Sequence, residues 1–246
     1  VFIWDMDETL ILLKSLLNGT YAMAFNGLKD MHKGVEIGRR WENLILQICD
    51  EFFFYEQVEN YNEPFLEALS EFDDGRDLSD YNFSKDSLDD LNKRKLAYRH
   101  RFIAQKYAQG LHNILDEERM KFWNNLYELT DVYTERWLSS ARTFLQQRNL
   151  NVLVTSGSLI PSLVKCLLFQ LDDFIVYSSW EVGKRQCFSW IKERFPGIKF
   201  CVIGDGSEEC EAAETMGWPF IGIDLRPHRF PGLTMKMVNH YFDIIY

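Results

Sequence analysis

Residues 151–178 read NVLVTSGSLIPSLVKCLLFQLDDFIVYS, and this stretch carries a strand–helix–strand pattern. Its two ends, NVLVT at 151–155 and FIVYS at 174–178, are short and almost continuously apolar, which suits strands buried on both faces of a parallel sheet. The segment between them has the length of a helix, and Pro161 marks its start. A strand, a helix and a second strand in succession indicate an α/β fold.

The same alternation continues toward the C-terminus and reappears at the N-terminus. Further strand-like runs are KFCVIGD at 199–205, PFIGI at 219–223 and VFIWD at 1–5. Helical segments separate the later runs: one begins at Gly183, and another, SEECEAAETM, stops at Gly217. We therefore predict a Rossmann-like open parallel sheet.

Residues 20–147 carry apolar side chains at helical spacing and show no strand signal. One such series is Trp41, Leu44, Ile45, Ile48 and Phe52. We predict an all-helical cap inserted between the first and second strands, with 1–19 and 148–246 forming the core. The acidic segment 71–90 within the cap fits either a solvated loop or the rim of a substrate site.

Composition limits the classes of function. The chain has 246 residues, 46% of them hydrophobic, which is enough material for a large core. Its formal net charge of −10 argues against nucleic acid and against an anionic membrane surface, because both are bound through basic side chains. No apolar run approaches the roughly 20 residues that a membrane span needs.

The cysteines indicate a reducing compartment. They are Cys49, Cys166, Cys187, Cys201 and Cys210. This odd, scattered set contains no CxxC pair, so we expect reduced thiols in an intracellular protein of the nucleus or cytoplasm. The sequence starts inside a strand-like run, so we expect any targeting signal to be missing from it. The five histidines have no metal-binding spacing, and we predict no catalytic role for them.

Chemically competent side chains follow four of the predicted strands. Asp5 and Asp7 follow the first strand, Thr155 ends the second, Lys184 comes soon after the third, and Asp205 follows the fourth. Ligands of open parallel sheets bind beyond the carboxyl ends of the strands. Two carboxylates as close as Asp5 and Asp7 repel each other unless a cation joins them.

These groups suit phosphoryl transfer. Mg²⁺ takes one or two carboxylates together with phosphate oxygens, and Asp5 and Asp205 can supply the carboxylates. An aspartate can attack phosphorus to form an aspartyl phosphate. Asp7 could then protonate the leaving oxygen and later activate water on the intermediate. Thr155 and Lys184 would hold the phosphate oxygens. Either Glu208 or Glu209 could orient water on the metal.

The order of these motifs resembles the haloacid dehalogenase superfamily, and the closer similarity is to the Eyes absent phosphatases. The residues that carry it are WDMDETLILLKSLLNGTYA at 4–22, YNF at 81–83, NVLVTSGSLIP at 151–161, GKRQCF at 183–188 and VIGDGSEE at 202–209. With the predicted cap, these cover nearly the whole chain. Because the chain is short, it resembles a plant-type member of the Eyes absent family.

The resemblance implies a Mg²⁺-dependent protein tyrosine phosphatase. It makes Asp5 the nucleophile and a metal ligand, Asp7 the acid and base and a metal ligand through its carbonyl, and Asp205 the third metal ligand. Glu209 matches the outer acid of the metal site better than Glu208.

The same resemblance implies the phosphate contacts. These are Thr9, Thr155, Ser156 and Lys184. Ser156-Gly157 departs from the threonines that animal members tend to carry, which makes substrate preference the open point. The implied partner is a phosphotyrosyl protein or peptide, and the cap is a candidate surface for a protein partner.

Two other functions fit the same residues. The first is a small-molecule phosphatase of the same superfamily, which a closing cap would favour over a peptide phosphatase. The second is a helical scaffold or transcription cofactor with a vestigial site. A scaffold would keep its biological activity after Asp5→Asn, whereas an enzyme would lose turnover with its fold preserved.

Overall fold

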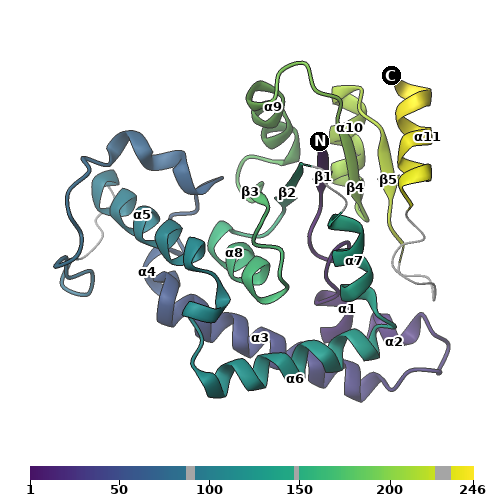
Figure 1. Cartoon of the computed structure of the whole chain (residues 1–246), viewed down its shortest axis with the longest axis horizontal. Coiled ribbons are helices and arrows are strands. Elements are labelled where there is room, and N and C mark those ends of the chain that lie inside the picture. The colour runs from purple at the N-terminus through teal and green to yellow at the C-terminus, as the bar shows by residue number, and fades with distance from the viewer. Residues whose placement is uncertain (87–91, 147–149, 225–233) are drawn as a thin grey trace.

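The computed structural model describes residues 1–86, 92–146, 150–224 and 234–246, and its centre is a five-stranded, all-parallel open sheet (Figure 1). The strands lie in the order β3-β2-β1-β4-β5. Their bounds are β1 Phe2–Trp4, β2 Asn151–Thr155, β3 Ile175–Ser178, β4 Cys201–Gly204 and β5 Phe220–Gly222. The predicted α/β class, the open parallel sheet and the helical segment between β1 and β2 are confirmed.

The central strand, β1, is paired on both sides. Ile3 lies opposite Val152 of β2 and Val202 of β4. One hydrogen bond continues the ladder past the strand, because the amide of Asp5 donates to the carbonyl of Ile203 at 2.9 Å. Asp5 is therefore fixed at the carboxyl edge of the sheet, beside the end of β4.

Each face of the sheet is covered by its own group of helices. Side chains such as Ile3 and Val154 pack with Phe188 of α9 (Lys184–Arg194) and Ala213 of α10 (Ser207–Met216). The opposite face belongs to a larger cluster that includes α7 (Trp137–Leu145), α8 (Leu159–Leu168) and α11 (Met235–Ile245). Strand residues alternate between the two clusters, as the pleat of a sheet requires.

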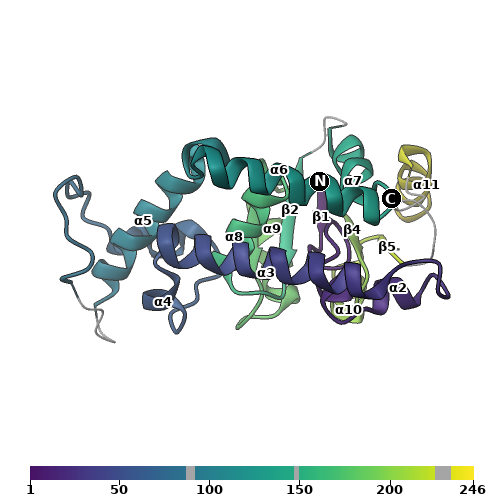
Figure 2. The same ribbon diagram turned by 90° about the horizontal axis from the view of Figure 1, so that it is seen from below.

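The segment between β1 and β2 is helical, as predicted. Before α7 it contains α1 (Lys14–Leu17), α2 (Thr20–Met23), α3 (Met31–Phe53), α4 (Tyr55–Val58), a 3₁₀ segment (Leu66–Phe72), α5 (Lys93–Gln109), a 3₁₀ turn (Leu111–Asn113) and α6 (Glu117–Tyr133). The long helices α3 and α6 lie side by side and contact each other (Figure 2). α5 lies at the end of the molecule far from α11 (Figure 1).

Two contacts join this helical segment to the helix that follows β2. The rings of Trp41 in α3 and Phe169 at the end of α8 are 4.4 Å apart between centroids. The indole of Trp123 in α6 donates to the carbonyl of Leu168 at 2.8 Å. α7 instead contacts the sheet, because Phe144 meets Trp4 edge to face at 5.5 Å. The predicted boundary at 147/148 falls outside the described residues.

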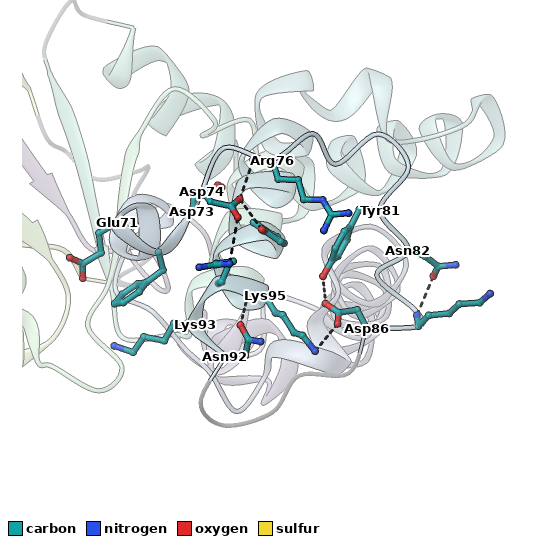
Figure 3. Close-up of a pocket in the computed structure, with 14 residues that line it drawn as sticks. Glu71, Asp73, Asp74, Arg76, Tyr81, Asn82, Asp86, Asn92, Lys93 and Lys95 are labelled. Atoms are coloured by element: carbon teal, nitrogen blue, oxygen red, sulfur yellow. Dashed lines mark hydrogen bonds and ion pairs between the residues drawn. The ribbon is translucent and has the colours of Figure 1, made fainter.

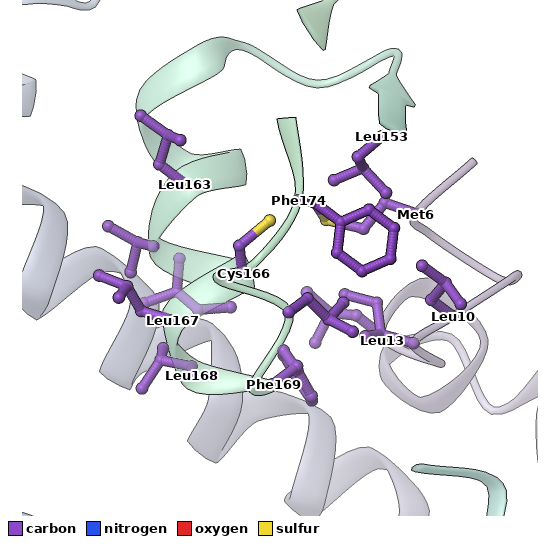
Figure 4. Close-up of a cluster of buried hydrophobic side chains, with 14 of the residues drawn as sticks. Met6, Leu10, Leu13, Leu153, Leu163, Cys166, Leu167, Leu168, Phe169 and Phe174 are labelled. Carbon is purple, nitrogen blue, oxygen red and sulfur yellow. The ribbon is translucent and has the colours of Figure 1, made fainter. Parts of the chain in front are cut away.

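Apolar side chains fix the segment after β1 against α8 (Figure 4). Met6 and Leu10 lie in one buried cluster with Leu153 of β2 and with Cys166 and Leu167 of α8. All five are at most 1% exposed. This packing sets where the side chains of residues 5–9 point relative to α8.

The acidic segment lies beside α5, and its residues 87–90 are outside the described part of the chain. Tyr98 of α5 donates to Asp74 at 2.8 Å, and Arg101 pairs with Asp73 at 2.8 Å. Arg99, also in α5, is fully buried and donates to the carbonyls of Phe83 and Asp86. Among the described residues, no helix combines the length and apolar character required to cross a bilayer.

Candidate active site

Lys184 joins two carboxylates at the carboxyl edge of the sheet. Its Nζ lies 2.6 Å from Oδ1 of Asp5 and 2.7 Å from Oε2 of Glu209. Lys184 begins α9, Asp5 follows β1, and Glu209 lies in the first turn of α10. All three side chains are buried, so residues from three distant parts of the sequence share one water-poor site.

Asp205 completes a group of acids around Asp5. Ligand atoms of Asp5, Asp205 and Glu209 all lie within 4.8 Å of one another. The hydroxyl of Thr9, which is fully buried, donates to Oδ1 of Asp205 at 3.2 Å. The hydroxyl of Thr9 thus orients an acid of the cluster.

Glycine is required where β4 meets α10. A Cβ atom at Gly204 would lie 2.5 Å from Oε1 of Glu209, closer than such atoms approach each other. The amide of Gly206 donates to the same carboxylate, which holds it at the N-terminus of α10. An anion is stabilised there by the free amides and the helix dipole. The Gly-Asp-Gly sequence therefore brings Glu209 close to the backbone and to Lys184.

Burial and charge act in opposite directions on these groups. Burial raises the pKa of Asp5 to about 7, although Lys184 opposes the shift. Burial also raises the pKa of Asp205, and the charge of Glu209 adds to the effect. For Glu209, burial is outweighed by Lys184 and by the amide of Gly206, so its pKa is lowered. Burial alone would lower the pKa of Lys184, but Asp5 and Glu209 raise it.

The donor set fits a divalent cation. Three carboxylates against one ammonium leave two net negative charges where burial makes charge costly, and a cation offsets that cost. Mg²⁺ and similar hard ions prefer carboxylate oxygens, and magnesium sites use few of them. Asp5, Asp205 and Glu209 can therefore hold a metal ion.

Thr155 ends β2 beside a loop that is braced from the helical segment. Its hydroxyl accepts from the amide of Gly157 at 3.2 Å, and Ser156 between them is exposed. Asn62, which precedes the 3₁₀ segment, accepts from the amide of Leu159 at 2.8 Å and donates to the hydroxyl of Ser178 at 3.3 Å. Asn62 therefore joins the end of β3 to the start of α8.

Asp7 lies apart from the three-acid cluster. Nζ of Lys165 in α8 lies 2.8 Å from both Oδ1 and Oδ2 of Asp7. Between the two aspartates the backbone turns at Glu8, whose φ of +62° is uncommon for a residue with a side chain. The turn sends Asp5 toward α9 and α10, and Asp7 toward α8.

The sequence-predicted residues therefore fall into three places. Asp5, Lys184, Asp205 and Glu209 are together, with Thr9 against Asp205. Thr155 and Ser156 follow β2, and Asp7 pairs with Lys165.

Sequence reasoning missed Lys165, which contacts Asp7, and Asn62, which braces the loop after Thr155. The signal for Lys165 was available, because it is the only charged residue in the apolar run 159–171. Asn62 gave no comparable signal, since asparagine is common in loops.

A cavity of about 1010 Å³ lies elsewhere, beside α5 (Figure 3). It is lined by residues of 71–86 and 92–98, with Tyr98, Asp74 and Lys95 among them. None of the predicted site residues contributes to it.

Known proteins resemble the chain throughout its length. It is 58% identical to "Protein phosphatase EYA" of Arabidopsis thaliana, with all of this chain and 90% of that protein covered. It is 34% identical to "Protein phosphatase EYA2" of Homo sapiens and to "Protein phosphatase eya" of Drosophila melanogaster, with 89% of this chain covered in each case. Those matches span only 46% and 33% of the animal proteins. No family model matches the chain.

These identities confirm the resemblance seen in the motifs, including its plant-type character. The chain belongs to the protein phosphatase EYA family.

Proposed function

We propose that this chain is a Mg²⁺-dependent protein tyrosine phosphatase with Asp5 as its nucleophile. The observation that supports this most is the convergence of Lys184, Asp205 and Glu209 on Asp5. Asp5 is a buried carboxylate beside the ammonium of Lys184 and two further acids. This arrangement suits attack on a phosphate that is held by Lys184 and by a metal ion bound to the acids.

The first half of the reaction makes an aspartyl phosphate. An oxygen of Asp5 bonds to phosphorus, and the bond between phosphorus and the phenolic oxygen breaks. Asp7 gives its proton to the departing phenolate, which leaves as neutral tyrosine. Lys184, Thr155 and Ser156 contact the phosphate oxygens, and Thr9 supports the site through Asp205.

The second half restores the enzyme. Asp7, now a carboxylate, takes a proton from water while the water oxygen bonds to phosphorus. The bond between Asp5 and phosphorus breaks, so Asp5 is released as a carboxylate and phosphate leaves. Each side chain ends in its starting protonation state.

Asp5 and Asp205, with the carbonyl of Asp7, would hold the metal, and Glu209 would support it. A bound Mg²⁺ neutralises charge on the phosphate. The acids around Asp5 are the observation that supports a metal ion at this site.

The depth of the site supports a tyrosyl substrate. Asp5 is only 8% exposed, so a phosphate must reach well below the surface. The ring of phosphotyrosine places its phosphate farther from the backbone than the short side chain of phosphoserine does. Trp180, which is 65% exposed on the loop before Lys184, offers a surface on which an aromatic ring can stack.

The division of the chain belongs to the same proposal. Residues 1–19 and 148–246 form the phosphatase core, and 20–147 form a helical cap that is open to a peptide and presents a surface for a protein partner. An intracellular place, in the nucleus or cytoplasm, is supported by four cysteines that are buried and unpaired.

A comparison of substrates tests the proposal. The whole chain is assayed with a phosphotyrosyl peptide, the matching phosphoserine peptide and a sugar phosphate, in Mg²⁺ and in EDTA. We expect turnover of the phosphotyrosyl peptide that requires Mg²⁺ and falls about 10³-fold or more in Asp5→Asn. Asp80→Asn, which removes an exposed carboxylate far from the sheet edge, is the matched control.

The other outcomes contradict different parts of the proposal. Turnover of the sugar phosphate alone would exclude the tyrosyl assignment and keep Asp5 as nucleophile. A folded protein that binds Mg²⁺ and hydrolyses none of the three esters would exclude catalysis.

A further inference from the structure

Each of the two aspartates after β1 has its own lysine. Lys184 contacts Asp5 and Glu209, whereas Lys165 contacts both oxygens of Asp7 at 2.8 Å. The two ammonium groups are carried by different helices, α9 and α8. The carboxyl group of Asp7 is thereby held beside α8, separate from the acids around Asp5.

Lys165 is a costly residue at its position. It lies in the apolar run 159–171, between Val164 and Cys166, which are both fully buried. Its own side chain is only 15% exposed. A solvated lysine would leave this environment, so its ammonium is retained there by the paired carboxylate.

Both ends of the contact are fixed by packing. Cys166 and Leu167 anchor α8 in the cluster that also contains Met6 and Leu10 (Figure 4). Close to Asp7, the amide of Leu10 donates to Met6 and the amide of Glu8 donates to Ile11. The position of the Asp7 carboxylate is therefore defined by groups that have little freedom to move.

The contact leaves part of Asp7 accessible. Its side chain is 32% exposed, about twice the value for Lys165. A bidentate contact with one ammonium uses one lone pair of each oxygen, and each oxygen keeps another. The contact with Lys165 thus leaves part of the Asp7 carboxyl group open to water.

We propose that Lys165 is a positioning residue that holds the carboxyl group of Asp7 in place for hydrolysis of the aspartyl phosphate. The inference rests on the proposed function, because it assigns Lys165 to one half of that reaction. In this half, water gives a proton to Asp7, its oxygen bonds to phosphorus, and the bond from phosphorus to Asp5 breaks. Lys165 touches neither the phosphate nor the water and acts through Asp7.

A substrate whose leaving group needs no proton from Asp7 isolates the hydrolysis of the aspartyl phosphate. The leaving group of 2,4-dinitrophenyl phosphate departs without a proton, so kcat/KM reports formation of the aspartyl phosphate without the help of Asp7. Hydrolysis of the aspartyl phosphate then contributes to kcat alone. We expect Lys165→Met to lower kcat about 10–100-fold and to change kcat/KM by less than about threefold.

Rapid mixing provides a second readout of the same step. The variant should release close to one dinitrophenolate per enzyme in a burst and then turn over slowly, because the aspartyl phosphate accumulates. Lys192→Met, an exposed lysine of α9, is the matched control and should show neither change. If Lys165→Met does not fold, Lys165→Gln, which keeps a hydrogen-bond donor, is measured in the same way.

Three results would overturn the inference. These are an equal fall of kcat and kcat/KM, unchanged kinetics, and faster turnover in the variant. Failure of the proposed function looks different, because the unmodified protein would then release no dinitrophenolate in Mg²⁺.

Discussion

Asp5, Lys184 and Glu209 depend on one another at the level of single residues. Lys184 has both acids within 2.7 Å, and Glu209 also accepts from the amide of Gly206. Removing the charge of Glu209 would leave Lys184 with Asp5 alone. The ammonium would then compete more strongly with a cation for the nucleophile.

Glu209→Gln should therefore weaken Mg²⁺ binding. We expect the dissociation constant to rise about 10–100-fold, the usual effect of removing a group that supports a metal ligand. Titration calorimetry of the whole chain measures it, with Glu214→Gln, on the exposed side of α10, as the control. An unchanged constant would remove Glu209 from the metal site.

The individual residues that could be predicted are those with a fixed relation to a strand end. Asp5, Lys184 and Asp205 each follow a recognisable strand, and neighbouring parallel strands end at one edge. The contact between Lys165 and Asp7 could not be predicted in this way. It depends on which side of α8 faces the segment after β1, and the sequence of α8 is apolar almost all round.

At the level of elements, α3 makes room for α1 through a glycine. A Cβ atom at Gly38 would lie 2.9 Å from the backbone nitrogen of Leu17. α1 comes soon after the segment that carries Asp5 to Thr9. The close approach of α3 thus fixes the position of α1 in the chain that leads away from the site.

Gly38→Ala should destabilise the protein although alanine favours helices. The gain in helix propensity is about 1 kcal/mol, whereas the crowded backbone costs about 1–3 kcal/mol, so we expect a net loss of about 1 kcal/mol. Urea unfolding measures the difference. Arg39→Ala, at the exposed neighbouring position, should stay within about 0.5 kcal/mol of the parent, and equal values for the two variants would contradict this account.

The strands, the helices between them and the helical character of the insertion were predictable, but the packing partner of each helix was not. Residues 137–145 read as part of the helical insertion, and the helix α7 is there. It packs against the sheet through Phe144 and Trp4. Helical periodicity identifies the apolar face of a helix and gives no information about the element that covers it.

At the scale of the whole molecule, the sheet and the inserted helices share one hydrophobic cluster. It contains Trp41 of α3 and Trp123 of α6 as well as Trp4 and Leu153 of the sheet. We therefore expect both parts to unfold in one transition. The pH dependence of stability then reports groups from either part.

His100 of α5 should make the protein less stable in mild acid. Burial lowers its pKa to about 4, and a backbone hydrogen bond at Leu66 opposes the shift only in part. The unfolded chain takes up a proton near pH 6.5, so the stability is fully present above that pH and falls as the pH drops toward 4. Asp5, whose pKa is raised, makes the protein less stable as the pH rises. The effect of His100 is therefore separated from that of Asp5 by comparing variants.

The comparison is between the parent and His100→Gln. By pH 5 the parent should lose about 2 kcal/mol relative to the variant, measured by urea unfolding between pH 5 and 8. The exposed His112→Gln provides the control. Parallel curves for the parent and His100→Gln would show that His100 is not kept neutral by the fold.

The strand order also constrains how the protein is made. β1 occupies the middle of the sheet, and Phe2 pairs with Asn151 and with Cys201. On the ribosome, the central strand emerges long before either of its neighbours, and the inserted helices emerge in the interval. An apolar strand must therefore wait unpaired in the nascent chain until β2 is synthesised, and paired on one side only until β4 follows, a period in which chaperone binding competes with aggregation.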